Sequence, residues 1–317
     1  MAPLPKELDL VCADFGAALD LLRNLGLRLE IIYPADEPHS AVLSHDGTII
    51  RLTSRPDAPP ASVTLPEFRP EFVVTHASGD SGEGRAGMRY RDLIPGRLGG
   101  RYIASHITIP EGGPVADWVH FHRIAVQLIC VRRGWVRVVY EDQGPPFVMQ
   151  AGDLVLQPPG IRHRVLESSP GLEVVEITCP ALHETLAEHE MDLPNGGPVA
   201  SRLYGGQHFL HHVAATSSWT AWHGAEAQET QVSDASGRLA EARILKPGAS
   251  GMIAVPPHDG ELVFGFVLEG RVQLDHGHSY ELGPADSFVI PPGEAWRLRE
   301  TSDDFRLLHV TTGRIRR

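Results

Sequence analysis

The stretch HFHRIAVQLICVRRG, residues 120–134, carries side chains well suited to binding a metal ion. His120 and His122 are separated by one residue, and Gln127 follows shortly after them. Alternate residues of a β-strand point to the same face, so both imidazoles can face the interior of a β-barrel. Imidazole nitrogen binds Fe, Zn, Ni and Cu well. The alternative is that these residues are hydrogen-bonded polar members of an ordinary barrel wall.

The composition fits a β-rich globular protein that binds neither nucleic acid nor membrane. The chain has 317 residues and a net charge of −12, whereas nucleic acid and anionic lipid surfaces attract clustered Lys and Arg. Its 26 prolines and 32 glycines predict many turns. Three widely spaced cysteines predict no disulfide framework, and no apolar run suggests a signal peptide or membrane helix. We therefore expect a cytoplasmic protein whose partner is a small-molecule substrate.

Residues 1–56 read as a strand, a helix and three strands. Apolar residues recur at helical spacing from Phe15 to Leu25, with Asp14 as the expected N-cap and Gly26 as the glycine after the helix. This βαβββ pattern resembles one half-module of the glyoxalase/vicinal-oxygen-chelate class. Members of that class pair two modules and hold a metal on their strands, whereas this single module lacks ligand-like residues. We interpret it as a structural or interface domain.

An internal repeat organises the rest of the chain. GDLVLQPPGIRH at residues 152–163 matches ADSFVIPPGEAW at residues 285–296. Upstream of these, VRRGWVRVV at residues 131–139 matches VLEGRVQL at residues 267–274. Two consecutive copies of one β unit explain both matches.

The repeat sets the expected domain limits. Residues 57–85 are rich in Pro, Gly and Ser and have the composition of a linker. The first β unit is expected over residues 86–196 and the second over residues 197–317.

The residues around the two histidines resemble the first motif of the cupin superfamily, G(X)5HXH(X)3–4E(X)6G. Gly113, His120, His122, Gln127 and Gly134 follow its order. Gln127 departs from the motif, because glutamate is usual at that position.

The second cupin motif, G(X)5PXG(X)2H(X)3N, is matched in turn by Gly152, Pro158, Gly160 and His163, with Glu167 in place of the asparagine. Both motifs occur in order at a fitting separation. The resemblance implies a mainly β fold with two double-stranded β-helix, or jelly-roll, barrels: a bicupin.

The same resemblance implies a metal site in the first barrel, formed by His120, His122, Gln127 and His163. Three imidazoles and one oxygen donor leave open positions on the ion, which a catalytic site requires. A neutral amide would leave the dipositive charge intact and favour an anionic chelating ligand; alternatively, Gln127 does not ligate. We expect one divalent transition metal, with Fe(II) as the first choice and Zn, Ni or Mn as alternatives.

The second copy lacks this ligand set. Alignment of the repeats places Pro256, His258, Val263 and Trp296 at the four positions. A single histidine does not hold a metal tightly, so the second barrel is expected to be metal-free and structural.

Three further residues are candidate substrate contacts. Trp118 precedes His120 by two residues and should share its face of the strand, where it could equally be a core residue. Arg101 and Tyr102 lie on a strand leading into the site, so one of them could face the lumen. Surface ion pairing is the alternative for the arginine, and no catalytic group is identified.

The pattern favours a metal-dependent enzyme, namely a non-haem dioxygenase that acts on a small oxygen-rich organic acid or an enolic or aromatic substrate. One alternative is a redox-free isomerase, cyclase or lyase that uses the metal as a Lewis acid, for which the sequence shows no clear general base. Another is a non-catalytic small-molecule binding protein. A homodimer is expected by analogy with cupins that associate through sheet edges.

Overall fold

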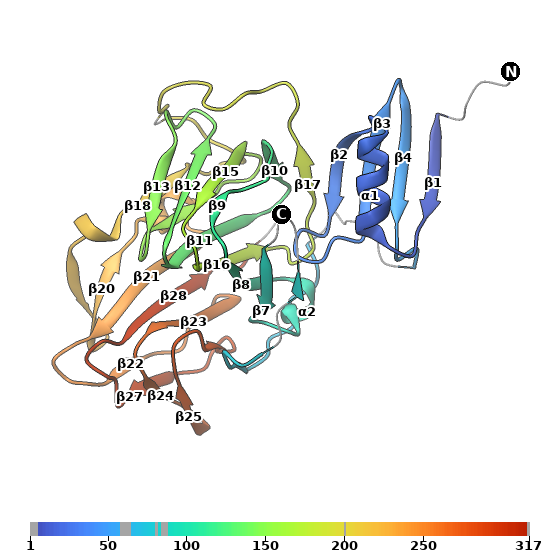
Figure 1. Cartoon of the computed structure of the whole chain (residues 1–317). Coiled ribbons are helices and arrows are strands. Elements are labelled where there is room, and N and C mark those ends of the chain that lie inside the picture. The colour runs from blue at the N-terminus through green and yellow to red at the C-terminus, as the bar shows by residue number, and fades with distance from the viewer. Residues whose placement is uncertain (1–5, 58–64, 80–81, 84–87, 200, 316–317) are drawn as a thin grey trace, which may run out of the picture.

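The protein is mainly β, with two jelly-roll barrels side by side and a small module at the N-terminus (Figure 1). The computed structural model describes residues 6–57, 65–79, 82–83, 88–199 and 201–315. In these parts of the chain, no helix is long and apolar enough to cross a membrane. The predicted mainly β, two-barrel class is confirmed.

The N-terminal module has the predicted βαβββ order. It consists of β1 (Glu7–Val11), α1 (Phe15–Asn24), β2 (Arg28–Tyr33), β3 (Ser40–His45) and β4 (Thr48–Thr53). Asp14 caps α1 by accepting a hydrogen bond from the backbone N–H of Ala17 at 2.9 Å. The helix covers one face of the sheet, whose strand order is β1-β4-β3-β2.

This module is joined to the first barrel by a continuous sheet. Strand β17 (Thr185–Ala187) pairs with β2 on one side and with β10 (His120–His122) on the other. The strand that carries the two histidines is therefore only one strand away from the N-terminal module.

The first barrel is formed by two facing sheets. The rest of the first sheet consists of β9 (Gly113–Pro114), β12 (Trp135–Tyr140), β13 (Phe147–Gln150) and β15 (His163–Ser168). The second sheet contains β6 (Gly82–Glu83), β7 (Arg89–Asp92), β8 (Ile103–Ile109), β11 (Val126–Arg133), β14 (Leu154–Leu156), β16 (Leu172–Cys179) and β18 (Leu210–His212). The short helix α2 (Arg97–Gly100) precedes β8.

The second barrel repeats this plan. Its larger sheet contains β5 (Val73–Thr75), β19 (Trp219–Trp222), β20 (Ala225–Glu229), β21 (Ala240–Pro247), β23 (Leu262–Glu269), β26 (Ser287–Val289) and β28 (Arg306–Thr312). Its smaller sheet contains β22 (Ile253–Val255), β24 (Val272–His276), β25 (His278–Leu282) and β27 (Trp296–Arg299). Two short turns of helix, η2 (Ala214–Thr216) and α3 (Val232–Ala235), flank β19 and β20.

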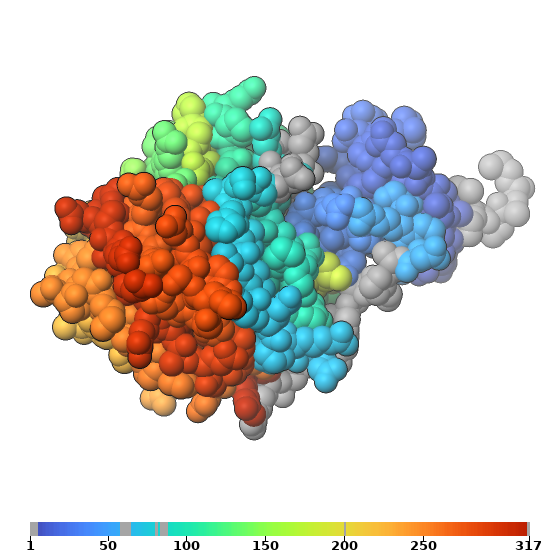
Figure 2. All heavy atoms as spheres, turned by 90° about the horizontal axis from the view of Figure 1, so that it is seen from below, coloured from blue at the N-terminus to red at the C-terminus, as the bar shows by residue number. Residues whose placement is uncertain are grey.

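Three strands cross the domain limits expected from the sequence, one of which is β6, a linker strand that pairs with β7 of the first barrel. Strand β5 lies in the expected linker, yet it pairs with β26 of the second barrel. Strand β18 lies in the expected second barrel, yet it pairs with β14 of the first. Figure 2 shows the cyan segment that includes β5 and β7 packed against the orange and red second barrel. Pro- and Gly-rich composition identified the segment between units but not the strand pairing that a neighbouring sheet edge imposes on it.

Alternate residues of β11 pack into two different hydrophobic cores. Val126, Leu128 and Cys130 point into a core cluster that also contains residues of the second barrel, such as Phe264. Ile129, on the opposite face of β11, packs against the core of the first barrel. Each strand of this sheet thus presents one face to the partner barrel and the other to its own lumen.

Candidate metal centre

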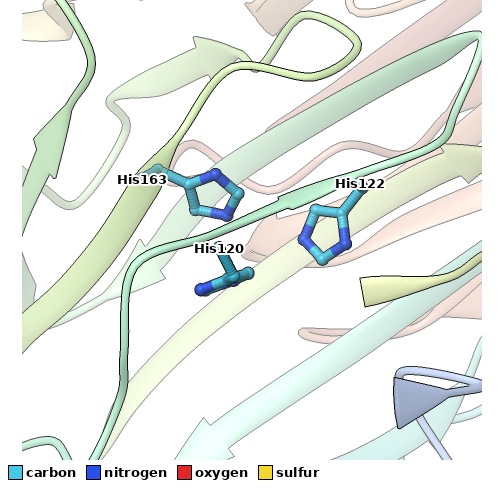
Figure 3. Close-up of side chains that lie close together, drawn as sticks. All are labelled: His120, His122 and His163. Atoms are coloured by element: carbon cyan, nitrogen blue, oxygen red, sulfur yellow. The ribbon is translucent and has the colours of Figure 1, made fainter. Parts of the chain in front are cut away.

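The structure brings His120, His122 and His163 together inside the first barrel. One nitrogen of each ring lies within 4.8 Å of the corresponding nitrogens of the other two, and all three residues are buried. His120 and His163 face each other across the β10–β15 pair, with ring centroids 4.2 Å apart. Figure 3 shows the three rings gathered around a common space. Strand alternation on β10 and the strand pairing together produce this convergence.

Backbone carbonyl groups set the orientation of two of these rings. Nδ1 of His120 donates to the carbonyl oxygen of Trp118 at 2.7 Å, and Nδ1 of His163 donates to that of Ile161 at 3.0 Å. A carbonyl oxygen only accepts, so the hydrogen of each neutral ring is on Nδ1 and the lone pair is on Nε2. Metal-binding histidines are commonly oriented by this kind of outer hydrogen bond. The donor set therefore fits a divalent transition metal.

The third ring is oriented by a side chain. Nδ1 of His122 lies 3.2 Å from Oγ1 of Thr185 on β17. The buried carboxylate of Asp117 also lies beside the cluster, with its Oδ1 3.6 Å from Nδ1 of His120. Neither Thr185 nor Asp117 was identified from the sequence, where both are single polar residues without a motif.

Gln127 lies on β11 beside Ile129 and is fully buried. Its Oε1 accepts a hydrogen bond from Nε2 of Gln157 at 2.6 Å, and Oε1 of Gln157 accepts one from the Tyr140 hydroxyl at 2.9 Å. The Tyr140 ring in turn stacks on His163, with centroids 5.5 Å apart. Burial raises the pKa of Tyr140, so its hydroxyl stays protonated and continues to donate. A hydrogen-bonded chain thus links Gln127 to the face of the third histidine.

The histidines lie at a small cavity in the lumen of the first barrel, which we call the histidine cavity. Its volume is about 100 Å³. Most of its wall is apolar, formed by Met88, Ile107, Ile109, Ile129, Val136, Val138, Met149, Val165, Leu172 and Val174. Beside the histidines and the Tyr140–Gln157 pair, its polar lining residues are Tyr90, Arg164 and Glu176.

Glu176 is a functional candidate that sequence reasoning missed. It lies on β16 directly opposite Ile129 of β11 and lines the histidine cavity. Strand alternation gave a usable signal, because residues 172, 174 and 176 share one face and the first two are buried aliphatic side chains. A carboxylate at the third position of such a series faces the lumen. Glu176 is therefore a candidate general base for the redox-free isomerase, cyclase or lyase alternative.

Arg164 follows His163 on β15 and borders the histidine cavity. Its neighbours on the strand, His163 and Val165, face the lumen, so by strand alternation the guanidinium lies on the other face of β15. Its Nε atom is buried and has no hydrogen-bond partner within the described parts of the chain.

The structure corrects the prediction for Arg101 and Tyr102, which do not line the histidine cavity. Arg101 forms a two-point ion pair with Glu261 of the second barrel, at 2.8 and 2.9 Å, and the Tyr102 hydroxyl donates to the same carboxylate at 3.0 Å. Tyr102 belongs to the core cluster shared by the two barrels. Both residues precede β8 instead of lying on a strand, since Arg101 caps the C-terminus of α2 and β8 begins at Ile103.

Trp118 contacts the site from outside the cavity. Its ring meets the His120 ring edge to face, with centroids 5.1 Å apart, and also packs on the core of the N-terminal module. A surface hollow beside α1 is lined by Trp118 and His189, among others. Trp118 therefore bridges the candidate metal centre and the N-terminal module rather than lining the histidine cavity.

Two kinds of similarity to known proteins support the fold: one to a protein family and one to solved structures. Residues 243–311, in the second barrel, match the cupin domain family. No curated protein matches the sequence significantly. The family match and the histidine cluster therefore fall in different barrels.

Several solved structures share the whole two-barrel arrangement. The protein Ylba from E. coli is 12% identical, with a TM-score of 0.55 over 80% of this chain and 94% of its own. A variant of oxalate decarboxylase from Bacillus subtilis is 11% identical, with a TM-score of 0.55 over 82% of this chain and 81% of its own. A variant of salicylate 1,2-dioxygenase from Pseudoaminobacter salicylatoxidans is 17% identical, with a TM-score of 0.56 over 78% of this chain and 85% of its own. Residues 243–311 thus match the cupin domain family, and the chain as a whole shares its fold with these solved structures.

Proposed function

We propose that this protein is a metal-dependent enzyme whose first barrel holds one divalent transition metal through His120, His122 and His163. The observation that carries the proposal is the convergence of three buried imidazoles, with the lone pairs of at least two rings on Nε2. When bound, such a metal would supply Lewis-acid chemistry and, in the case of Fe(II), oxygen chemistry beside the substrate. Gln127 is proposed as a neutral oxygen donor or as a residue that sets the charge of the site.

The substrate proposed for this site is a small planar organic acid that carries two neighbouring oxygen atoms. The aliphatic wall of the histidine cavity suits an aromatic or enolic ring, and the cavity volume of about 100 Å³ limits its size. The hydroxyl of Tyr140, held by Gln157, would fix the edge of the ring beside His163.

The first reaction proposed is oxidative ring or enol cleavage by a non-haem dioxygenase. The salicylate 1,2-dioxygenase variant among the similar structures acts, by its name, on a small aromatic hydroxy acid, which agrees with the substrate class inferred from the apolar wall. The apolar side chains would keep bulk water away from the bound ring.

This proposal is tested by oxygen consumption. The wild-type chain would be purified without a His tag, loaded anaerobically with Fe(II), and assayed with salicylate, gentisate and an enolic acid. We expect about one equivalent of bound iron and uptake of oxygen that depends on the aromatic or enolic acid. His120→Ala should lose both, whereas His189→Ala, which removes a histidine that hydrogen-bonds the Leu29 carbonyl, should keep both. If His120→Ala kept both its bound iron and its oxygen uptake, the proposal would be contradicted.

A redox-free reaction is the second candidate, and Glu176 is the observation that favours it. A carboxylate at the wall of the histidine cavity could accept a proton from a carbon or hydroxyl next to a polarised carbonyl group. The two candidates separate in one experiment, in which Zn(II) or Mn(II) replaces Fe(II) under nitrogen. Turnover of a keto or enol acid without oxygen would establish the isomerase, cyclase or lyase class. Tight binding of these acids without turnover under any metal would instead establish a binding protein.

A further inference from the structure

The second barrel contains a cavity of its own at the place that corresponds to the candidate metal centre of the first. Its volume is about 280 Å³. The four residues that the internal repeat aligns with the predicted ligands all line it: Pro256, His258, Val263 and Trp296. We call it the second-barrel cavity. Apart from His258, the residues at these four positions differ from those of the first barrel, yet the space between them stays open.

A buried histidine faces this cavity with unsatisfied hydrogen-bonding groups. His309 on β28 is 2% exposed and lines the second-barrel cavity. Neither Nδ1 nor Nε2 has a hydrogen-bond partner among the residues that the structure describes. Leaving a buried polar group unpaired is destabilising, so a molecule that pairs with this ring would recover that free energy.

The ring is neutral at physiological pH. Burial, together with the nearby charge of Arg243, lowers the pKa of His309 to about 3. A neutral imidazole offers one N–H donor and one nitrogen acceptor. A hydroxyl group can both donate to and accept from such a ring, whereas an ionised carboxylate can only accept and would leave the acceptor nitrogen unpaired.

Two tryptophans make the walls around this histidine. The Trp222 ring lies 5.1 Å from the His309 ring and the Trp296 ring lies 5.5 Å from it, measured between centroids. Trp296 is buried against Phe288, whereas Trp222 is partly exposed at the cavity. Flat aromatic walls favour a planar apolar ring as the occupant.

The charges in the cavity compensate one another. Arg243 is paired with Glu241, also at the cavity wall, and its Nε donates to Glu229 at 2.9 Å. Within the described residues, the one group of three potential ligand atoms close enough to hold a metal is that of the first barrel. Neither an anion nor a metal ion of the same kind is therefore favoured here, and an uncharged molecule is.

We propose that the second barrel binds a small, uncharged, planar hydroxyaromatic molecule, with its hydroxyl group hydrogen-bonded to His309 and its ring against Trp222 and Trp296. The site is independent of the candidate metal centre and does not require the reaction proposed above. It gives the second barrel a ligand-binding role, where the sequence alone suggested a structural one.

The proposal is tested by calorimetric titration of the full chain with phenol, with benzoate and toluene as comparison probes. We expect phenol to bind at least tenfold more tightly than either comparison probe. His309→Leu, which keeps the volume and removes the polar atoms, should weaken phenol binding at least tenfold. His120→Ala should leave phenol binding unchanged, which separates this site from the metal centre. Equal phenol affinity in wild type and His309→Leu, or loss in His120→Ala, would overturn the proposal.

A second measurement covers the case in which His309→Leu fails to fold. The imidazole nitrogens of the wild-type chain would be followed by NMR while phenol is added, with Trp222→Leu as the second variant. A shift of the His309 nitrogens on addition of phenol, reduced in Trp222→Leu, supports the site. Unchanged His309 nitrogens at saturating phenol, as expected if ordered water alone satisfies the ring, would refute it.

Discussion

Glu176 and His309 occupy equivalent positions in the two barrels. Glu176 on β16 faces Ile129 of β11, and His309 on β28 faces Gly265 of β23. Ile129 and Gly265 each lie the same distance before the glycine that follows their strand. Both polar side chains line the cavity of their own barrel. The repeat therefore keeps a titratable group at this wall position, as a carboxylate beside three histidines and as a neutral imidazole beside two tryptophans.

Glu176→Gln should remove the proton acceptor of the redox-free reaction without removing the metal. We expect kcat to fall by roughly 10²–10⁴-fold if the carboxylate is the general base. Glu167→Gln, which alters a partly exposed carboxylate paired with Arg137, is the control. Loss of bound metal in Glu176→Gln would instead assign the carboxylate to metal binding.

Thr185→Val should weaken metal binding while preserving the fold. The substitution keeps the shape of a buried strand residue but removes the hydroxyl next to Nδ1 of His122. Loss of an outer hydrogen bond to a ligand typically lowers metal affinity by about 10–100-fold. Competition with a coloured chelator measures the affinity, with Thr220→Val, on an edge strand of the second barrel, as the control. Unchanged affinity in Thr185→Val would show that the His122 ring is held by packing alone.

Gln127→Glu should strengthen the binding of a divalent metal. A carboxylate at this lumen position adds a negative charge, and Nε2 of Gln157 can still donate to it. We expect affinity to rise by roughly tenfold, since about 1.4 kcal/mol of added attraction corresponds to that factor. Gln127→Met, of similar volume but without a hydrogen-bonding oxygen, serves as the matched control. Equal affinity in wild type and both variants would show that residue 127 does not influence the ion.

Glu173 should make stability depend on acid pH. Its carboxylate accepts from His106 at 2.8 Å and pairs with Arg132, and these contacts, led by the His106 hydrogen bond, lower its pKa to about 2. Since the pKa is lower in the folded than in the unfolded chain, the stabilisation is complete above about pH 5 and is lost as pH falls toward 2. Wild type should therefore exceed Glu173→Gln in unfolding free energy by on the order of 3 kcal/mol at pH 7, with a smaller difference at pH 3.

Urea unfolding at several pH values between 3 and 7 measures this difference. Glu300→Gln, a change at an exposed carboxylate, should show no such trend. A difference between wild type and Glu173→Gln that stays constant over this range would contradict the assignment.

Arg101 and Glu261 should govern stability rather than substrate binding. They form a buried ion pair between the barrels, so Arg101→Met leaves the Glu261 carboxylate without its main partner. Breaking a buried pair costs about 3–5 kcal/mol, whereas replacing both partners by apolar residues costs much less. We expect a large loss of thermal stability in Arg101→Met, partial recovery when Glu261→Met is added, and unchanged metal content in both. A raised KM with normal stability would restore Arg101 as a substrate contact.

The sequence alone was enough to predict the fold class and to single out the three histidines as candidate metal ligands. Strand periodicity, turn residues and the internal repeat are local signals, and they predict two consecutive copies of one β unit, while the resemblance to the cupin motifs implied that each copy is a jelly-roll barrel. The spacing of His120 and His122 placed both rings on one face of a strand, and the repeat marked residues 256–296 as a copy with different chemistry. Helical spacing with an Asp14 cap likewise predicted α1 correctly.

Tertiary structure decided which faces meet and which polar groups share a cavity. Thr185 reaches His122 only because β17 pairs with β10. Glu176 lines the same cavity as the histidines only because β16 belongs to the sheet that faces them. Arg101 was assigned to the site from its sequence position, but the partner barrel brings Glu261 to it instead. These contacts join residues far apart in the chain, so no local pattern records them. Their partners are set by the packing of two sheets and two barrels, which depends on the whole chain.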